Sequence, residues 1–96
     1  MMLREPVGIR IVPKVEIYTR AFCGYCYRAK RLLDSKGIEY QEHEVFFGGP
    51  EKEEMIQRSE GRTTVPQIFI DDHHIGGCSE LMELESQGKL DELLAA

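Results

Sequence analysis

The chain has 96 residues, of which 42% are hydrophobic and 30% charged, and its formal net charge is −5. This length suits a single domain, and the acidic balance argues against nonspecific binding of nucleic acid. No segment approaches the roughly 20 apolar residues that cross a membrane, and the N-terminal residues show no secretory signal.

Hydrophobic periodicity and turn residues predict a domain over 15–96, preceded by an N-terminal extension over 1–14. The elements expected in chain order are strand 15–19, helix 24–36, strand 39–45, helix 50–59, strands 67–71 and 73–76, helix 79–87 and a short turn from Leu90. The strand–helix–strand start predicts parallel pairing, and the polar turn before residue 73 predicts a hairpin. The expected fold class is α/β, with a four-stranded mixed sheet flanked by helices.

The first strand-to-helix junction carries Cys23-Gly24-Tyr25-Cys26. We expect Cys23 at the helix N-terminus, where free N–H groups and the helix dipole stabilise a thiolate. Cys26 follows about one turn later, on the same helical face as Ala29 and Leu33. One exposed, ionised sulfur beside a sheltered one is what thiol–disulfide exchange requires. Five basic residues against one acidic residue between 20 and 36 favour anionic substrates at this site.

A Cys-x-x-Cys pair can also be half of a zinc site, which needs two further ligands at matching spacing. The remaining candidates are Cys78, His43 and the adjacent pair His73-His74, and adjacent residues rarely chelate one ion together. We therefore expect a redox pair and no metal site. Three cysteines fit a reducing compartment better than a disulfide framework, so a cytoplasmic location is expected.

Thr64-Val65-Pro66 precedes the third strand. Most X–Pro bonds are trans, and a proline can simply open a strand. In combination with the cysteine motif, we favour a cis Val65–Pro66 bond that turns the backbone of Val65 toward the cysteines. There the backbone can pair with an extended peptide.

Gly76-Gly77-Cys78-Ser79 joins the fourth strand to the next helix. The glycines either form a simple turn or let a ligand carboxylate approach the helix N-terminus. We expect Ser79 to cap this helix and Cys78 to be partly buried at its start.

Other polar and aromatic residues need no functional role. We expect the histidines at 43, 73 and 74 on the surface, and Arg28, Lys30 and Arg31 on a solvated helix face. The pair Phe46-Phe47 is expected to plug the core at the end of the second strand, with room for one of the two rings to be exposed.

Together these motifs resemble those of the glutaredoxins, and most closely the small bacterial dithiol class. The resemblance covers about residues 15–94 and rests on Thr19-Arg20-x-x-Cys23-x-Tyr25-Cys26, Thr63-Thr64-Val65-Pro66-Gln67 and Gly76-Gly77-Cys78, in that order and spacing. It implies a thioredoxin-like fold whose sheet is ordered second, first, third and fourth strand. It also implies a monomeric oxidoreductase that reduces disulfide-containing and glutathionylated proteins, with glutathione as co-substrate.

By position, the resemblance makes Cys23 the nucleophile and Cys26 the resolving thiol. The glutathione-binding residues that it implies are Arg20, Tyr25, Thr64, Val65, Pro66, Gly77, Cys78 and Ser79.

Two residues depart from the family pattern. Gly24 replaces the proline between the cysteines, and in some similar proteins a small residue there accompanies a [2Fe–2S] cluster held between two subunits. A glutathione-ligated cluster carrier is therefore one alternative function. Ser79 replaces a frequent aspartate and offers the ammonium group of the ligand no charge.

The other alternative function is a thioredoxin-like donor served by a flavoprotein reductase. Arg20 and the pair Gly76-Gly77 argue against this alternative.

Overall fold

One four-stranded sheet organises residues 12–95, the part of the chain that the computed structural model describes. In chain order the elements are β1 (Val15–Thr19), α1 (Gly24–Ser35), β2 (Gln41–Glu44), α2 (Pro50–Arg58), β3 (Gln67–Ile70), β4 (His73–Gly76), α3 (Cys78–Ser86) and α4 (Leu90–Leu94). The predicted extension over 1–14 lies almost wholly outside the described residues, so its boundary stays a prediction. No helix among the described residues has both the length and the apolar composition that crossing a membrane demands.

The strands lie in the order β2-β1-β3-β4, which is the order implied by the resemblance. β1 and β2 are parallel, with α1 as their crossover, whereas β3 pairs antiparallel with both β1 and β4. The hairpin turn consists of Asp71 and Asp72, whose φ angles are both positive, at 51° and 68°. Such turns match the twist of the flanking strands. The predicted mixed sheet and hairpin are confirmed.

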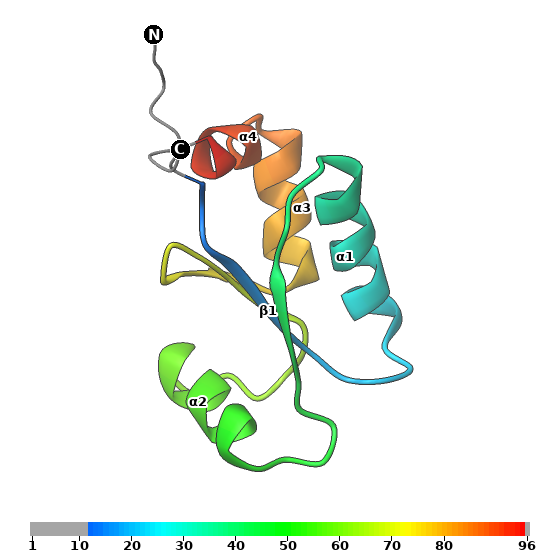
Figure 1. The fold of residues 1–96 in the computed structure, drawn as a ribbon, viewed down its shortest axis with the longest axis vertical. Helices are drawn as coiled ribbons and strands as arrows, with labels where there is room; N and C mark the ends of the chain where they lie inside the picture. The colour runs from blue at the N-terminus through cyan, green and yellow to red at the C-terminus, as the bar shows by residue number, and fades with distance from the viewer. Residues whose placement is uncertain (1–11, 96) are drawn as a thin grey trace, which may run out of the picture.

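Helices cover both faces of the sheet: α1, α3 and α4 lie on one face and α2 on the other (Figure 1). β1 is buried along its whole length because it has a neighbouring strand on each side and helices on both faces. Successive side chains of a strand point to opposite faces. Ile17 therefore packs with Leu33 and Leu81, and Tyr18 packs with Met55.

Several element boundaries differ from the prediction by one or two residues. β2 spans Gln41–Glu44 instead of 39–45, because its pairing with β1 covers only these four residues. α3 begins at Cys78, one residue earlier than predicted. Pro50 stands in the first turn of α2, where a missing N–H costs nothing, as the sequence predicts.

The prediction that Phe46 and Phe47 plug the core is wrong. Their side chains are 49% and 92% exposed, and their rings contact each other with centroids 4.8 Å apart. Val45 takes the buried position at the end of β2 and packs with Met55 on the α2 face. The chain turns directly after Val45, which carries both phenylalanines toward solvent.

The prediction that His43 is a surface residue is also wrong. Its ring stacks on Tyr18 with centroids 4.6 Å apart, and its side chain is 11% exposed. Its ring nitrogens lie 3.3 Å from a carboxylate oxygen of Glu16 and 3.0 Å from one of Glu51. The histidines at 73–74 are exposed, as predicted.

Candidate active site

Cys23 is the N-cap of α1, at the position that the sequence predicts. Its backbone is extended (φ −110°, ψ 112°), and its Sγ accepts a hydrogen bond from the N–H of Cys26 at 3.3 Å. The first N–H groups of a helix have no carbonyl partner within the helix, so a sulfur here satisfies one of them. The same contact stabilises negative charge on the sulfur.

Burial alone would raise the pKa of the Cys23 thiol, but several hydrogen bonds outweigh it. They come from the Cys26 thiol and from the backbone N–H groups of Cys26 and Tyr25. The Arg20 guanidinium acts in the same direction, so the pKa of Cys23 lies below its ordinary value. A lower pKa enlarges the thiolate fraction at neutral pH, and the thiolate is the reactive form.

Cys26 has the opposite environment. It is buried on the inner face of α1 with Ala29 and Leu33. Burial, together with the hydrogen bond and the charge of Cys23, raises the pKa of the Cys26 thiol to about 12. The two thiols therefore differ in acidity and in exposure, as the sequence predicts.

The segment before β3 passes close to Cys23. The Val65–Pro66 bond is cis, as predicted, and the Val65 carbonyl oxygen lies 4.0 Å from the Cys23 sulfur. The buried side chain of Gln67 holds this segment, since its Nε2 donates to the Thr64 carbonyl at 3.0 Å and contacts the Thr64 hydroxyl at 3.3 Å. Sequence reasoning assigned Gln67 no role of its own.

The start of α3 differs from the prediction in one respect. The expected capping role of Ser79 is wrong: Ser79 is an exposed residue inside the first turn. Glu80 supplies the cap, because its Oε1 accepts a hydrogen bond from the N–H of Gly77 at 2.6 Å. Gly76 has a φ of +118°, and a Cβ there would lie 2.7 Å from the same oxygen. Cys78 is buried at the helix start, as predicted, and burial raises the pKa of its thiol.

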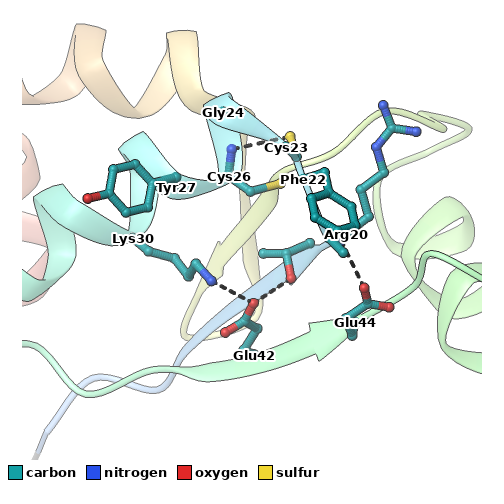
Figure 2. A pocket seen from close by; sticks show the side chains of 11 residues that line it. Arg20, Phe22, Cys23, Gly24, Cys26, Tyr27, Lys30, Glu42 and Glu44 are labelled. Carbon is teal, nitrogen blue, oxygen red and sulfur yellow. Dashed lines mark hydrogen bonds and ion pairs between the residues drawn. The ribbon is translucent and has the colours of Figure 1, made fainter.

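A cavity of about 500 Å³ opens beside the two cysteines, between α1 and β2 (Figure 2). Its lining includes Arg20, Cys23, Cys26, Lys30, Glu42 and Glu44. Of the residues implied to bind glutathione, Arg20 belongs to this lining, whereas Tyr25, 64–66 and 77–79 lie outside it. Cys23 therefore both lines this cavity and lies beside the segment that carries Val65.

Three polar contacts cross the cavity. Lys30 Nζ donates to Glu42 Oε2 at 3.0 Å, and the Thr19 hydroxyl donates to the same oxygen at 2.6 Å. The N–H of Ala21 donates to Glu44 Oε2 at 2.9 Å, which fixes the loop before Cys23 to β2. The prediction that Lys30 lies on a solvated face is wrong, since its side chain is 30% exposed and paired.

The sequence contains a signal for one of these cavity residues. Lys30 follows Cys26 by four residues, and that spacing places both side chains on one helical face. Glu42 and Glu44 carry no such signal, because their place beside α1 depends on the β1–β2 register.

The structure brings some of the predicted site residues together and leaves others apart. Cys23, Cys26 and the Val65 carbonyl lie together, and Arg20 and Cys78 are close enough for their charges to act on Cys23 or respond to it. Pro66 and Gly77 are buried beside one another, since a Cβ on Gly77 would lie 3.2 Å from the Pro66 carbonyl oxygen. The side chains at 25, 64 and 79 are exposed. An activated thiol with a second thiol in reserve can exchange with disulfides.

Residues 15–75 match the family model described as Glutaredoxin. Glutaredoxin 3 of Escherichia coli (strain K12) is 59% identical over 80 residues, which are 83% of this chain and 95% of the relative. The solution structure of a glutaredoxin from Brucella melitensis is 50% identical with a TM-score of 0.75, and the match covers 91% of this chain and 94% of that one. The crystal structure of a buckwheat glutaredoxin–glutathione complex is 35% identical with a TM-score of 0.76, over 85% of this chain and 76% of that one. The expected thioredoxin-like fold is confirmed by these likenesses.

Proposed function

Since the chain belongs to the glutaredoxin family, whose members are glutathione-dependent thiol–disulfide oxidoreductases, we propose that Cys23 is its nucleophile and Cys26 its resolving thiol. The observation that supports this most is the contrast between the two sulfurs. Cys23 accepts the N–H of Cys26 at the start of α1 and has a lowered pKa, whereas Cys26 is 2% exposed and has a raised one. The thiolate form is therefore favoured at Cys23 and disfavoured at Cys26.

With a glutathionylated protein, the Cys23 thiolate attacks the glutathione sulfur. A Cys23–glutathione disulfide forms, and the protein thiolate leaves and takes a proton from solvent. The thiolate of a second glutathione attacks the bound glutathione sulfur. Glutathione disulfide forms, and Cys23 leaves again as a thiolate, so one glutathione thiol is consumed and the net reaction exchanges the protein–glutathione disulfide for glutathione disulfide.

With a protein disulfide, the first attack links Cys23 to one sulfur of the substrate. The Cys26 thiolate then attacks the Cys23 sulfur, which releases the second substrate thiolate and leaves a Cys23–Cys26 disulfide. Two glutathione molecules reduce this disulfide in turn, which restores both thiols and forms glutathione disulfide.

The glutathione-binding residues are proposed to be Arg20, Tyr25, Thr64, Val65, Pro66, Gly77, Cys78 and Ser79. The position of the Val65 carbonyl, 4.0 Å from the Cys23 sulfur, supports a ligand that runs along this backbone. The similar buckwheat glutaredoxin forms a complex with glutathione in its crystal structure, which supports glutathione as that ligand. Disulfide-containing or glutathionylated proteins, a monomeric state and a cytoplasmic location are proposed on the same basis.

The assignment of the two thiols is tested by comparing Cys23→Ser and Cys26→Ser with two substrates. Cys23→Ser should abolish turnover of both a glutathionylated peptide and a protein disulfide. Cys26→Ser should keep the first activity and lose the two-thiol reduction of the second. Activity retained in Cys23→Ser, together with the loss of both activities in Cys26→Ser, would reverse the two roles. Cys78→Ser removes the third thiol for comparison: both reactions should still turn over, and any loss should appear in the KM for glutathione, because Cys78 is proposed to bind glutathione and not to exchange.

The cluster-carrier alternative rests on Gly24 alone and stays a prediction. A Cβ at Gly24 would meet nothing within 4 Å, so Gly24→Pro offers a clean comparison. Both proteins would be reconstituted anaerobically with iron, sulfide and glutathione. A colourless, monomeric wild-type protein would remove the alternative, and visible absorbance that proline abolishes would support it. The thioredoxin-like alternative is disfavoured by the identity to glutaredoxins.

A further inference from the structure

We propose that Lys30 is a positioning residue for the resolving step. Its ammonium group, held by Glu42, stabilises the Cys26 thiolate while that sulfur attacks Cys23. This inference rests on the proposed assignment of Cys26 as the resolving thiol.

Lys30 and Cys26 line the same cavity. They are four residues apart on α1, so their side chains lie on one face of the helix. Both line the cavity of about 500 Å³ between α1 and β2. Figure 2 shows Lys30 reaching from α1 toward Glu42 on β2, on the side of the helix that carries Cys26.

The ammonium group is held in this place. Lys30 Nζ donates to Glu42 Oε2 at 3.0 Å, and the Thr19 hydroxyl fixes the same oxygen from β1 at 2.6 Å. The Lys30 side chain is 30% exposed and that of Glu42 is 36% exposed. A charge held in a partly buried position is screened less by water and salt than one at the end of a free lysine.

Several charged or titratable groups surround Cys26. Those that line the cavity are Cys23, Tyr27 and Lys30 at the start of α1 and along it, Arg20 before α1, and Glu42 and Glu44 on β2. Tyr40, which precedes β2, acts on Lys30. Burial and Cys23 raise the pKa of the Cys26 thiol, whereas the Arg20 backbone and the Lys30 ammonium lower it. The coupling is mutual, since a charged Cys26 is among the groups that raise the pKa of Lys30, after Glu42.

The need for this charge arises in the mixed disulfide. Once the Cys23 sulfur is bonded to a substrate sulfur, Cys26 must still give up its proton from a buried position. The proton leaves to solvent, and the resulting thiolate attacks the Cys23 sulfur. The Cys23–Cys26 bond forms, and the bond from Cys23 to the substrate sulfur breaks. The departing thiolate keeps the electron pair. Among the groups around Cys26, Lys30 is a cation on the same helix. It is positioned to stabilise the Cys26 thiolate during this step.

The resolving step can be observed directly with one equivalent of the aromatic disulfide dithiobis(nitrobenzoate), in a Cys78→Ser background. The first, bimolecular phase releases one coloured thiolate as Cys23 forms the mixed disulfide. The second, unimolecular phase releases another as Cys26 attacks. Lys30→Gln should slow the second phase about three- to tenfold at neutral pH and shift its pH profile upward by up to about one unit. The first phase should change less than about twofold.

Two variants serve as controls. Lys30→Arg keeps the charge and should restore most of the second-phase rate. Arg31→Gln makes the same change in net charge on the same helix, but Arg31 is exposed and is not among the residues that line the cavity, so both phases should be unaffected.

An unchanged second phase and pH profile in Lys30→Gln would overturn this proposal alone, with the thiol assignment intact. An equal loss in both phases would also overturn it, because the effect would then not be confined to Cys26. A second phase that persists in Cys26→Ser would overturn the assignment of the resolving thiol, and this proposal with it.

Discussion

Cys23 and Cys26 belong to one helical turn, yet their thiols meet different surroundings. Cys23 lies outside the helix at its N-cap and accepts an otherwise unpartnered N–H. Cys26 lies one turn further along and faces the apolar interior with Ala29 and Leu33. The difference in acidity between the two thiols follows from their spacing of three residues along the start of a helix. No separate basic side chain is needed to deprotonate Cys23.

Arg20 is expected to act on binding and hardly on folding. Its exposed guanidinium lowers the pKa of Cys23, and Arg20 lines the cavity beside that residue. Arg20→Glu should raise the KM for glutathione severalfold, and it should change the free energy of unfolding by only about 0–1 kcal/mol. Steady-state kinetics and urea denaturation measure the two effects. Arg31→Glu is the matched control, and an unchanged KM in Arg20→Glu would remove Arg20 from the site.

Phe22, in the loop before Cys23, has an unfavourable backbone conformation. Its φ is +60° and its side chain is fully exposed, at 102%. The left-handed conformation costs an L-residue about 1–2 kcal/mol, and glycine would remove this cost from the folded state. Glycine also gives the unfolded chain more conformational freedom, which cancels part of the gain in stability. Phe22→Gly should therefore raise the free energy of unfolding by about 0–1 kcal/mol in urea denaturation.

Phe47 provides the comparison for Phe22. It is 92% exposed and is not among the described residues with positive φ, so Phe47→Gly should lower the free energy of unfolding by about 0.5–1 kcal/mol. If Phe22→Gly were destabilised as much as Phe47→Gly, the ring of Phe22 would be contributing contacts that outweigh its backbone strain.

At the scale of elements, the first turn of α3 is capped by a side chain from within the helix. The carboxylate of Glu80 reaches back to the N–H of Gly77 at 2.6 Å and satisfies a donor at the helix start. Arg62 lies 3.5 Å from the same carboxylate oxygen. The hydrogen bond to Gly77 is the main reason that the pKa of Glu80 lies below its ordinary value. This cap leaves no space for a side chain at Gly76.

Gly76→Ala is therefore expected to break the cap. The new Cβ would meet Glu80 Oε1 at 2.7 Å, and the φ of +118° is strained for alanine. We expect a loss of about 2–3 kcal/mol in the free energy of unfolding, measured with urea. Gly88→Ala is the matched control: its φ is +73°, but nothing lies within 4 Å of the new Cβ, so only about 1 kcal/mol should be lost. Equal losses in the two variants would show that the cap contributes nothing.

At the scale of the whole molecule, a charged network joins α2 to the sheet on the face opposite α1. Arg58 donates to both carboxylate oxygens of Glu16, at 2.9 and 3.2 Å, and to the Tyr18 hydroxyl at 2.8 Å. Its guanidinium also lies 4.0 Å from the ring centroid of Phe69. Because α2 buries only Met55 fully, these polar contacts provide much of its attachment.

Arg58→Met should remove this attachment. It leaves the largely buried Glu16 carboxylate without its main partner, which should cost about 2–4 kcal/mol of unfolding free energy in urea denaturation. Lys52→Met, on the same helix, is the matched control and should cost less than about 1 kcal/mol. Similar small losses in both variants would contradict a structural role for the network.

The same network predicts a dependence of stability on pH. The Arg58 hydrogen bonds hold the pKa of Glu16 below its ordinary value of 4.5, so folding favours the ionised form. The resulting stability is fully present above the unfolded pKa and is lost as the pH falls through the lowered folded pKa. Glu16→Gln should be less stable than the wild type at neutral pH and should lose stability less steeply on acidification below about pH 4.5. Parallel pH profiles of the two proteins would contradict this.

Local patterns in the sequence determined much of this protein. The order of the elements, the hairpin turn and the unlike environments of Cys23 and Cys26 all follow from spacings of a few residues. Such patterns are predictable because helix and strand periods fix which neighbouring side chains share a face. The cis bond before Pro66 is predictable only in combination with the cysteine motif.

The partners of these residues were decided only by the tertiary structure. In the parallel register of β1 and β2, Glu42 stands opposite Ile17 and His43 opposite Tyr18. A shift of one residue would exchange the faces of β2, because strand side chains alternate with a period of two. That register brings Glu42 to Lys30 beside Cys26 and buries His43 against Tyr18. No spacing along the chain encodes it, since it is set by how the sheet and its two helical layers pack together.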